Sequence, residues 1–214
     1  MPRPRFEHLA AEKKKAVIDA ASGEFSEKGY TGASVSGIIG RAGISKGALY
    51  YYFDDKEDLF LTVILDIQDK VFAAVGDFPA VASADEFWRA AEDYFRSVLG
   101  FAFEHPVFAG LIRSFNRATA RGELKRPLRE FQQPHFDFHR RFIRSGQAAG
   151  AVRTDLPDDL LFPLVEGIDQ AGDLWFARHF EEFTPGDMEN VHGLLLNLYR
   201  RILEPGDDAL EMSP

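Results

Sequence analysis

Residues 33–53, ASVSGIIGRAGISKGALYYYF, constrain the fold most strongly because they predict two short helices joined by a tight turn. Ser34 is suited to cap the first helix, since its hydroxyl can accept a hydrogen bond from a free amide of the first turn. Gly43 can adopt the left-handed conformation that ends this helix. Ser45 is then placed to cap a second helix that runs through Phe53. Two helices separated by a short glycine-containing turn form a helix-turn-helix.

The second predicted helix has two different sides. At about 100° per residue, Leu49 and Phe53 share the side that faces the protein interior. The opposite side and its flanks offer a cation, two small residues and three phenols: Lys46, Gly47, Ala48, Tyr50, Tyr51 and Tyr52. Small residues let a helix approach base edges, whereas tyrosine and lysine suit phosphate oxygens. This composition indicates a helix that enters a DNA groove; the alternative is an ordinary surface helix with exposed tyrosines.

The run from Lys14 to Leu59 resembles the DNA-binding domain of the tetracycline-repressor (TetR/AcrR) family of transcription regulators. The matching positions agree in order and spacing: Ala20, Ala21, Phe25, Gly29, Tyr30, Ser34, Val35, Ile38, Ala42, Gly43, Ile44, Ser45, Gly47, Leu49, Tyr50, Tyr52, Phe53, Lys56 and Leu59. Ala33 departs from a frequent Thr, which removes a phosphate contact, and Gly40 departs from the usual Ala-Lys or Ala-Glu. The resemblance implies an all-α fold of about nine helices, with a three-helix N-terminal head on a helical effector and dimerisation body.

The helix geometry and the resemblance together predict which residues contact a double-stranded DNA operator. They are Ser34, Ser36, Ser45, Lys46, Gly47, Ala48, Tyr50, Tyr51, Tyr52 and Lys56. Lys56 occupies the position where the family has a phosphate-contacting lysine. It lies at the start of the next helix, where backbone amides also favour anions.

The net charge of −9 is unusual for a DNA-binding protein until the chain is divided. Residues 1–53 hold 8 Lys+Arg against 5 Asp+Glu, whereas the remainder holds 17 against 29. This asymmetry predicts that the N-terminal end meets a polyanion, although an acidic body could also serve only solubility. The chain has no cysteine, so a reducing cytoplasm is the simplest compartment. Neither a signal peptide nor a transmembrane segment is predicted.

The sequence predicts three regions: a DNA-binding domain over 1–55, a ligand-binding and dimerisation domain over 56–206, and a disordered tail over 207–214. Residues 1–8 are expected to form a loose basic arm. Outside the helix-turn-helix, the predicted helices span Leu9–Lys28, Lys56 to about Gly76, Asp85 (as cap) to His105, Val107–Ala120, Leu124–Ala149 with a kink or break at Pro134, Asp158–Phe180, and Thr184–Leu203 with a capping box of Thr184 and Asp187.

The last two predicted helices have long apolar faces. In the family that the head resembles, these helices pair with their mates in a four-helix homodimer interface, for which the candidates are Leu161, Val165, Ile168, Val191, Leu194, Leu195 and Leu198. Two-fold symmetry would present two recognition helices about 34–36 Å apart or slightly more, and would require a near-palindromic operator. The alternative is a purely intramolecular core.

The C-terminal body is rich in phenylalanine, of which the chain has 20. Ligand pockets are mostly apolar with a few orienting polar groups, so a small hydrophobic or aromatic effector is predicted. Its candidate contacts are Trp88, Phe108, Phe115, Asn116, Phe138, His139, Phe142, Asp169 and Trp175. For any single ring, plain core packing is the alternative. His135 and His139 lie one helical turn apart, as two metal ligands could, but ordinary histidines are favoured, and neither a metal nor a cofactor is predicted.

These features predict a ligand-responsive regulator, which family prevalence makes a repressor. The sequence contains no phosphate loop, nucleophile elbow or metalloprotease motif, and an enzyme is not predicted. Two other classes stay open. A helical binding or carrier protein could use residues 30–53 for protein contact, and amphipathic helices could lie on a membrane surface, although the acidic body disfavours anionic lipid.

Overall fold

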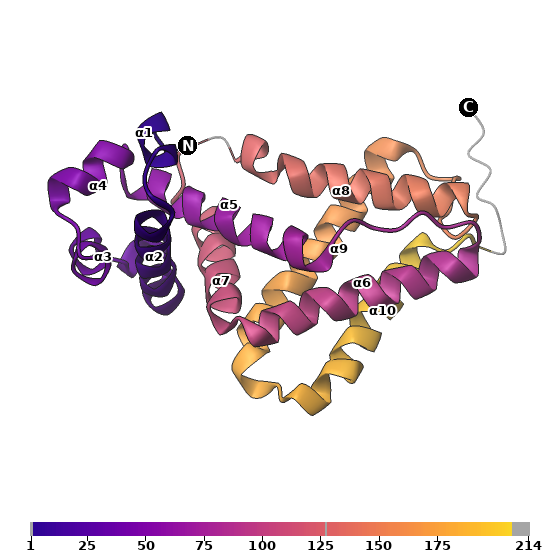
Figure 1. The fold of residues 1–214 in the computed structure, drawn as a ribbon. Coiled ribbons are helices and arrows are strands. Elements are labelled where there is room, and N and C mark those ends of the chain that lie inside the picture. Colours follow the sequence, from indigo (N-terminus) through magenta and orange to yellow (C-terminus); the bar gives the residue numbers. More distant parts are fainter. Residues whose placement is uncertain (1, 127, 207–214) are drawn as a thin grey trace. The chain divides into compact units, whose positions relative to one another are not determined.

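The computed structural model describes residues 2–126 and 128–206, which form two compact units. Unit 1 comprises Met1–Ala74 and Glu104–Pro127, and unit 2 comprises Val75–Phe103 and Leu128–Pro214. All regular secondary structure in the described residues is helical, which confirms the all-α prediction (Figure 1). The units do not follow the predicted boundary at residue 55, because most of the next helix and a later one belong to the same compact unit as the head. The predicted tail, 207–214, lies outside the described residues.

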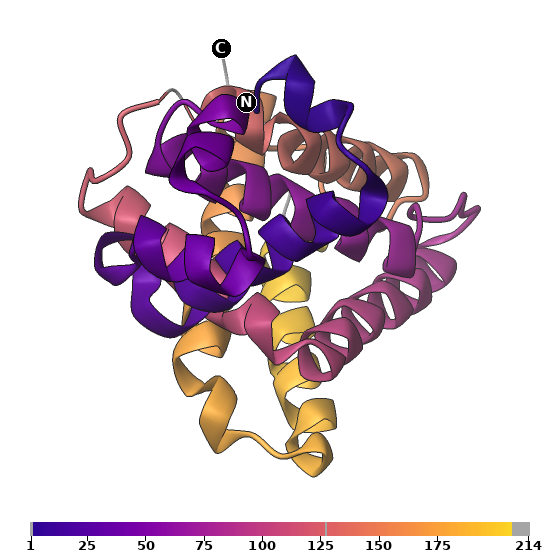
Figure 2. The ribbon, with the colours of Figure 1, turned by 60° about the vertical axis from the view of Figure 1, so that its left-hand side comes forward.

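Unit 1 contains six helices among its described residues (Figure 2). They are α1 (Pro4–Glu7), α2 (Ala11–Gly32), α3 (Val35–Ala42), α4 (Lys46–Tyr52), α5 (Lys56–Val75, all but its last residue) and α7 (Pro106–Ala120). Helix α2 packs against both α3 and α7. The apolar side chains at the predicted helical spacing fill the core of this unit: Val17, Ile18, Ala21, Phe25, Ile38, Leu49, Phe53, Phe60 and Leu111.

The predicted ends of the helix-turn-helix are confirmed in atomic detail. The Ser34 hydroxyl accepts a hydrogen bond from the Gly37 amide at 2.9 Å, and the Ser45 hydroxyl accepts one from the Ala48 amide at 3.1 Å. Gly43 adopts φ 64° and ψ 31°, the left-handed conformation that a side chain would disfavour. The caps and the turn therefore fix where α4 begins.

A fully buried carboxylate joins α2 to the start of α3. Glu24 accepts hydrogen bonds from Lys28 Nζ at 2.7 Å and from the Ser34 amide at 3.1 Å. The Lys28 hydrogen bond holds the pKa of Glu24 below its usual value, although burial opposes this. A Cβ at Gly37 would lie 2.9 Å from Glu24 Oε1, so the carboxylate also explains why glycine occupies position 37.

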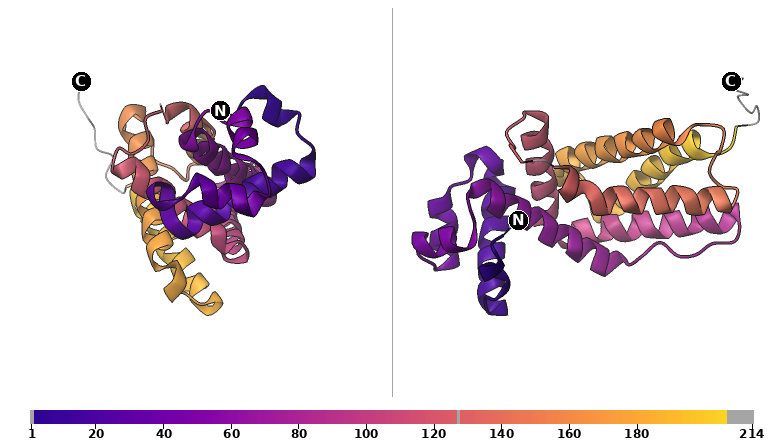
Figure 3. Two further views of the ribbon diagram at one scale, coloured as in Figure 1. Left: turned by 90° about the vertical axis from the view of Figure 1, so that its left-hand side faces the viewer. Right: turned by 90° about the horizontal axis from the view of Figure 1, so that it is seen from above.

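Unit 2 contains α6 (Ala84–Glu104, all but its last residue), α8 (Arg129–Ala148), α9 (Asp158–His179) and α10 (Met188–Leu203), with 3₁₀ turns η1 (Phe180–Glu182) and η2 (Pro185–Asp187) (Figure 3). Stacking of Tyr94 on Phe138, with centroids 4.7 Å apart, joins α6 to α8. A Phe95–Tyr199 contact at 5.0 Å joins α6 to α10. Helix α9 packs against α8 and α10, so aromatic rings and aliphatic faces close the core of this unit.

Several predicted helix limits need correction. The helix predicted from Asp85 is α6, and it is preceded by Ser83, whose hydroxyl accepts from the Glu86 amide at 3.3 Å. Helix α8 begins at Arg129 instead of Leu124 and continues through Pro134. Thr184 and Asp187 make the predicted contact, a hydrogen bond from the Thr184 amide to Asp187 Oδ2 at 2.8 Å, but α10 begins only after the turn η2.

The end of α2 and the N-terminal arm also differ from the prediction. Gly29 interrupts α2 with φ 72°, as the prediction of a helix end requires, but the helix resumes and reaches Gly32. The predicted loose arm contains the short helix α1, whose Phe6 is buried. The described residues thus contain ten α-helices, where about nine were predicted.

Replacing Gly110 with alanine should destabilise unit 1, because α2 and α7 approach too closely there for a side chain. A Cβ at Gly110 would lie 2.0 Å from Ser26 Oγ and 3.0 Å from the Ser26 carbonyl oxygen. We expect Gly110→Ala to lower the free energy of unfolding by about 1–3 kcal/mol, the range for overpacking. Urea denaturation followed by circular dichroism measures this loss.

Gly100→Ala is the matched control, since Gly100 lies exposed within α6 with no atom within 4 Å of its missing Cβ. It should be neutral or stabilising by up to about 1 kcal/mol through helix propensity. Equal unfolding midpoints for the two variants would contradict the close α2–α7 contact.

Candidate nucleic-acid interface

Helix α4 exposes the side that the sequence predicts to face DNA. Tyr50 and Tyr51 are 40% and 48% exposed, whereas Leu49 and Phe53 are buried at 2% and 1%. Of the flanking positions, Lys46 and Gly47 are exposed and Ala48 and Tyr52 are half-buried. Two small residues, a cation and exposed phenols therefore lie together on one helix that the protein core holds from behind.

The three serines predicted to contact DNA surround this helix and are all exposed: Ser34, Ser36 and Ser45. Ser34 and Ser45 already accept hydrogen bonds from the amides that they cap. A hydroxyl that accepts a hydrogen bond keeps its own O–H, which can be donated to a phosphate oxygen. Capping and phosphate binding are therefore compatible at both positions.

Lys56 lies at the start of α5 but does not project freely into solvent. Its Nζ donates to the carbonyl oxygens of Thr31 and Ala33, each at 3.3 Å, and lies 4.8 Å from the centroid of the Tyr30 ring. Burial lowers the pKa of Lys56. The ammonium group thus binds the C-terminal carbonyls of α2, and a phosphate contact by Lys56 requires it to share or leave these partners.

The N-terminal segment adds two arginines that the sequence prediction missed. Phe6 of α1 packs against Phe53 with ring centroids 4.8 Å apart, which fixes α1 beside α4. The Arg5 guanidinium then lies 4.5 Å from the centroid of the Tyr51 ring. Arg3 donates from Nη1 to the Tyr50 carbonyl at 3.1 Å. The only sequence signal was a lone apolar residue, Phe6, in a basic segment that begins with Pro4 at the first helical position.

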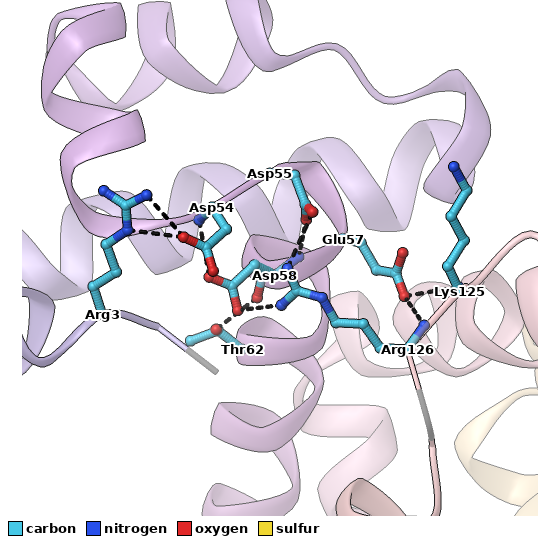
Figure 4. A network of polar contacts seen from close by, with 8 residues as sticks. All are labelled: Arg3, Asp54, Asp55, Glu57, Asp58, Thr62, Lys125 and Arg126. Atoms are coloured by element: carbon cyan, nitrogen blue, oxygen red, sulfur yellow. Dashed lines mark hydrogen bonds and ion pairs between the residues drawn. The ribbon is translucent and has the colours of Figure 1, made fainter.

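A network of carboxylates fixes the start of α5 directly after α4, as Figure 4 shows. Asp55 Oδ1 accepts from the Asp58 amide at 2.7 Å, and Asp58 Oδ2 accepts from the Asp54 amide at 3.1 Å, a reciprocal cap. Arg3 Nε donates to Asp54 at 2.8 Å, and Arg126 Nη1 donates to Asp58 at 2.8 Å. Arg126 Nη2 also donates to Asp55 at 3.0 Å.

Glu57 extends the network to the segment that follows α7. Its buried Oε1 accepts hydrogen bonds from the backbone amides of Lys125 and Arg126, at 2.9 and 2.7 Å (Figure 4). Two amides that would otherwise continue a helix are thereby bound to another element, which explains why residues 124–128 do not extend α8. Within unit 1, the segment after α7 is linked through α5 to the end of α4.

The predicted effector contacts are divided between the two units. Phe108, Phe115 and Asn116 lie on α7 in unit 1, and the other six lie on α6, α8 and α9 in unit 2: Trp88, Phe138, His139, Phe142, Asp169 and Trp175. Phe138 and Phe142 are buried in the aromatic core of unit 2, and Trp88 contacts Phe87 of the same core. Two small cavities of about 160 and 190 Å³ lie between α2 and α7, and neither is lined by any of the nine residues.

The predicted dimer contacts on α9 and α10 fall into two groups. Leu161, Val165 and Val191 are buried within the chain itself, so they are not available to a second chain. Leu194 and Leu198 are exposed, and Ile168 and Leu195 are half-buried. The structure adds exposed Leu160 and Leu164, each one position before a buried residue on α9. The apolar surface available to a partner therefore consists of Leu160, Leu164, Leu194 and Leu198.

None of the helices in residues 2–126 and 128–206 has the length and apolar composition needed to span a bilayer.

Comparisons with known proteins agree with this geometry. Residues 17–63 match the family model described as "Bacterial regulatory proteins, tetR family". The HTH-type transcriptional regulator RutR of Escherichia coli (strain K12) is 38% identical over 198 residues, which are 86% of this chain and 80% of RutR. The uncharacterized HTH-type transcriptional regulator YuxN of Bacillus subtilis (strain 168) is 29% identical over 134 residues, 60% of this chain but only 43% of YuxN.

Among solved structures, the transcriptional regulator FadR from Bacillus subtilis, determined in complex with stearoyl-CoA, superposes with a TM-score of 0.65. The match covers 86% of this chain and 95% of that chain at 19% identity, and it therefore supports the fold alone. The helix-turn-helix, the exposed side of α4 and the extensive identity to RutR lead to one conclusion. The chain belongs to the TetR family of DNA-binding transcriptional regulators.

Proposed function

We propose that this chain is a repressor that binds a near-palindromic operator as a homodimer through α4 and is released by a lipophilic small molecule. The observation that carries the DNA-binding part is the exposed side of α4, where Lys46, Gly47 and Tyr51 lie together while Leu49 and Phe53 anchor the helix. Binding to chromosomal DNA would place the protein in the cytoplasm, as the lack of cysteine also predicts.

The residues around α4 suit two different kinds of DNA contact. Gly47 and Ala48 leave the helix backbone close to the groove floor, where an alanine methyl can touch the methyl group of thymine. Lys46, Tyr50 and Tyr51 offer donors to phosphate oxygens, which fix the register of the helix without reading sequence. The Arg5 guanidinium over Tyr51 adds a second cation beside this ring. The proposed interface thus combines close approach in the middle with cations at its edge.

Homodimer formation is proposed for the exposed leucines of α9 and α10. Leu160, Leu164, Leu194 and Leu198 form an apolar surface on two helices that also pack against each other. A symmetric pairing of this surface with its copy would remove these side chains from water and relate two α4 helices by a two-fold axis. The near-palindromic operator follows from that symmetry.

Release by an effector would act through the segment that follows α7. Glu57 and Asp58 bind Lys125 and Arg126 of this segment, and Asp54 binds Arg3, which in turn holds the Tyr50 carbonyl. An effector that displaces residues 125–126 would change the support of α4 within unit 1. The class of effector is proposed from the aromatic side chains of the chain and from FadR, whose structure contains stearoyl-CoA.

Lys46→Ala and Tyr51→Ala should weaken operator binding. Fluorescence anisotropy on the DNA upstream of the protein's own gene, beside a scrambled duplex, measures this. Between about 50 and 200 mM salt, the affinity of the wild type should fall by roughly a thousandfold or more. Lys46→Ala should reduce the salt slope by about 1. Loss of the Tyr51 contact should weaken binding roughly tenfold, as expected for a hydrogen bond to a charged group.

Lys70→Ala is the matched control for Lys46→Ala, because Lys70 is an exposed lysine on α5 that pairs with Asp66. It should leave both the affinity and the salt slope unchanged. Weak, salt-insensitive binding of the wild type to both duplexes would instead favour a helical binding protein. Tight operator binding by Tyr51→Ala would show that the outward side of α4 is assigned incorrectly.

Leu194→Glu should dissociate the proposed dimer, since it places a charge in the apolar surface of α9 and α10. Sedimentation equilibrium should then give the mass of a monomer where the wild type gives that of a dimer. Val107→Glu is the control, because Val107 is an equally exposed apolar residue on α7 in unit 1. If the two variants have the same mass as the wild type, this surface does not mediate dimerisation.

Effector and operator should weaken each other's binding by the same factor, because coupling between two sites is reciprocal. The chain has two tryptophans, Trp88 and Trp175, both in unit 2, whose fluorescence can report the binding of long-chain acyl-CoA. We expect the acyl-CoA dissociation constant to rise on addition of operator, by the factor by which acyl-CoA raises the operator dissociation constant. Identical acyl-CoA affinities with and without operator would eliminate this mode of release.

A further inference from the structure

Two histidines of α8 and one aspartate of α9 converge inside unit 2. His135 Nε2 lies 2.8 Å from Asp169 Oδ2, and His139 Nε2 lies 3.8 Å from Asp169 Oδ1. One ligand atom from each of the three side chains lies within 4.8 Å of the other two. The sequence showed only the spacing of the two histidines, because Asp169 is brought to them by the packing of α9 on α8.

His139 has the features of a buried ligand more than those of an ordinary core residue. Its side chain is only 5% exposed, and its Nδ1 has no hydrogen-bond partner in the described part of the chain. The 3.8 Å between its Nε2 and Asp169 is longer than an ordinary hydrogen bond. A buried imidazole without close polar partners is unfavourable unless another group satisfies it.

The charges around the cluster favour a cation. Asp169 is 16% exposed, and its ion-pair partners within residues 2–126 and 128–206 are the two histidines, not a lysine or arginine. The carboxylates of Asp173 and Glu166, on the same helix, also act on His135. Three carboxylates thus lie near two imidazoles, and a divalent cation would offset their negative charge.

A second cluster in unit 2 provides a contrast. Glu92, Glu189 and His192 also lie close enough to share an ion. Arg96, however, bonds Glu92 at 2.8 Å and Glu189 at 3.4 Å, and His192 Nε2 is hydrogen-bonded to the Glu92 carbonyl oxygen at 3.0 Å. That cluster already has its cation in the guanidinium group, whereas the cluster around Asp169 does not.

We propose that His135, His139 and Asp169 bind a divalent transition-metal ion, with Zn²⁺ as the best match. Imidazole and carboxylate are ligands that such ions prefer, at metal–ligand distances of about 2.0–2.2 Å. Tetrahedral geometry then sets neighbouring ligand atoms about 3.3 Å apart. Small side-chain movements would bring the 2.8 Å and 3.8 Å separations to this value.

Tyr199 of α10 supports the carboxylate as an outer ligand would require. Its hydroxyl donates to Asp169 Oδ1 at 2.8 Å, which orients the carboxylate toward the histidines. Hydrogen bonds of this kind to metal-binding carboxylates stabilise the site. Three protein ligands leave at least one coordination position for water or a small molecule. This site goes beyond the proposed function, and its test requires neither DNA nor a dimer.

Isothermal titration of the EDTA-stripped, untagged full chain with Zn²⁺ tests the site. The wild type should bind one equivalent, and Co²⁺ in its place should give visible absorption of a low-coordinate ion. His135→Gln and Asp169→Asn should abolish binding or weaken it at least 100-fold. Tyr199→Phe, which removes the supporting hydrogen bond, should weaken it about 10–100-fold. Glu189→Gln, a matched acid-to-amide change in the contrasting cluster, should bind like the wild type.

Circular dichroism of each metal-free variant checks the fold, and His135→Gln is the decisive variant because its side chain is 38% exposed. A wild type that binds no Zn²⁺, or a His135→Gln variant that binds as tightly as the wild type, overturns the site. The same preparations can be tested for operator binding without metal. Operator binding by a chain that takes up no Zn²⁺ would remove the metal site and leave the regulator intact.

Discussion

The helix-turn-helix depends on one buried carboxylate. Glu24 receives the first amide of α3 through Ser34 and the ammonium of Lys28, and its oxygen occupies the space beside Gly37. A buried charge without such partners would destabilise the head, so α2 and α3 must keep this arrangement to stay folded. Because α3 leads through one glycine turn into α4, the position of the recognition helix follows from the position of Glu24.

Carboxylates have the same role at the other end of α4. Asp54, Asp55, Glu57 and Asp58 bind amides and guanidinium groups that come from α1 and from the segment after α7. The acidic residues nearest to the DNA-binding helix are therefore paired internally. This explains how a chain of net charge −9 can keep an exposed cationic surface beside α4.

Local signals determined what the sequence could predict. Both serine caps and Gly43 were predictable because each acts within three or four residues of its partner. The missed features involve distant partners: Arg3 bonds Asp54, 51 residues away, and Lys56 bonds the Thr31 carbonyl, 25 residues away. The dimer candidates were placed on the right helices but partly on the inward side, since Leu161 and Val165 are as apolar as the exposed Leu160 and Leu164. Hydrophobic periodicity cannot distinguish a core from a partner when both faces are apolar.

The short helix α1 has a consequence for how regulators of this kind diverge. Phe6 packs under α4, and Arg5 stacks on Tyr51. Substitutions in the first few residues can therefore change the charge and the rigidity of the DNA-facing surface without altering α4. Two homologues with identical recognition helices could differ in operator affinity for this reason. The DNA preference of an uncharacterised homologue should then be inferred from both segments together.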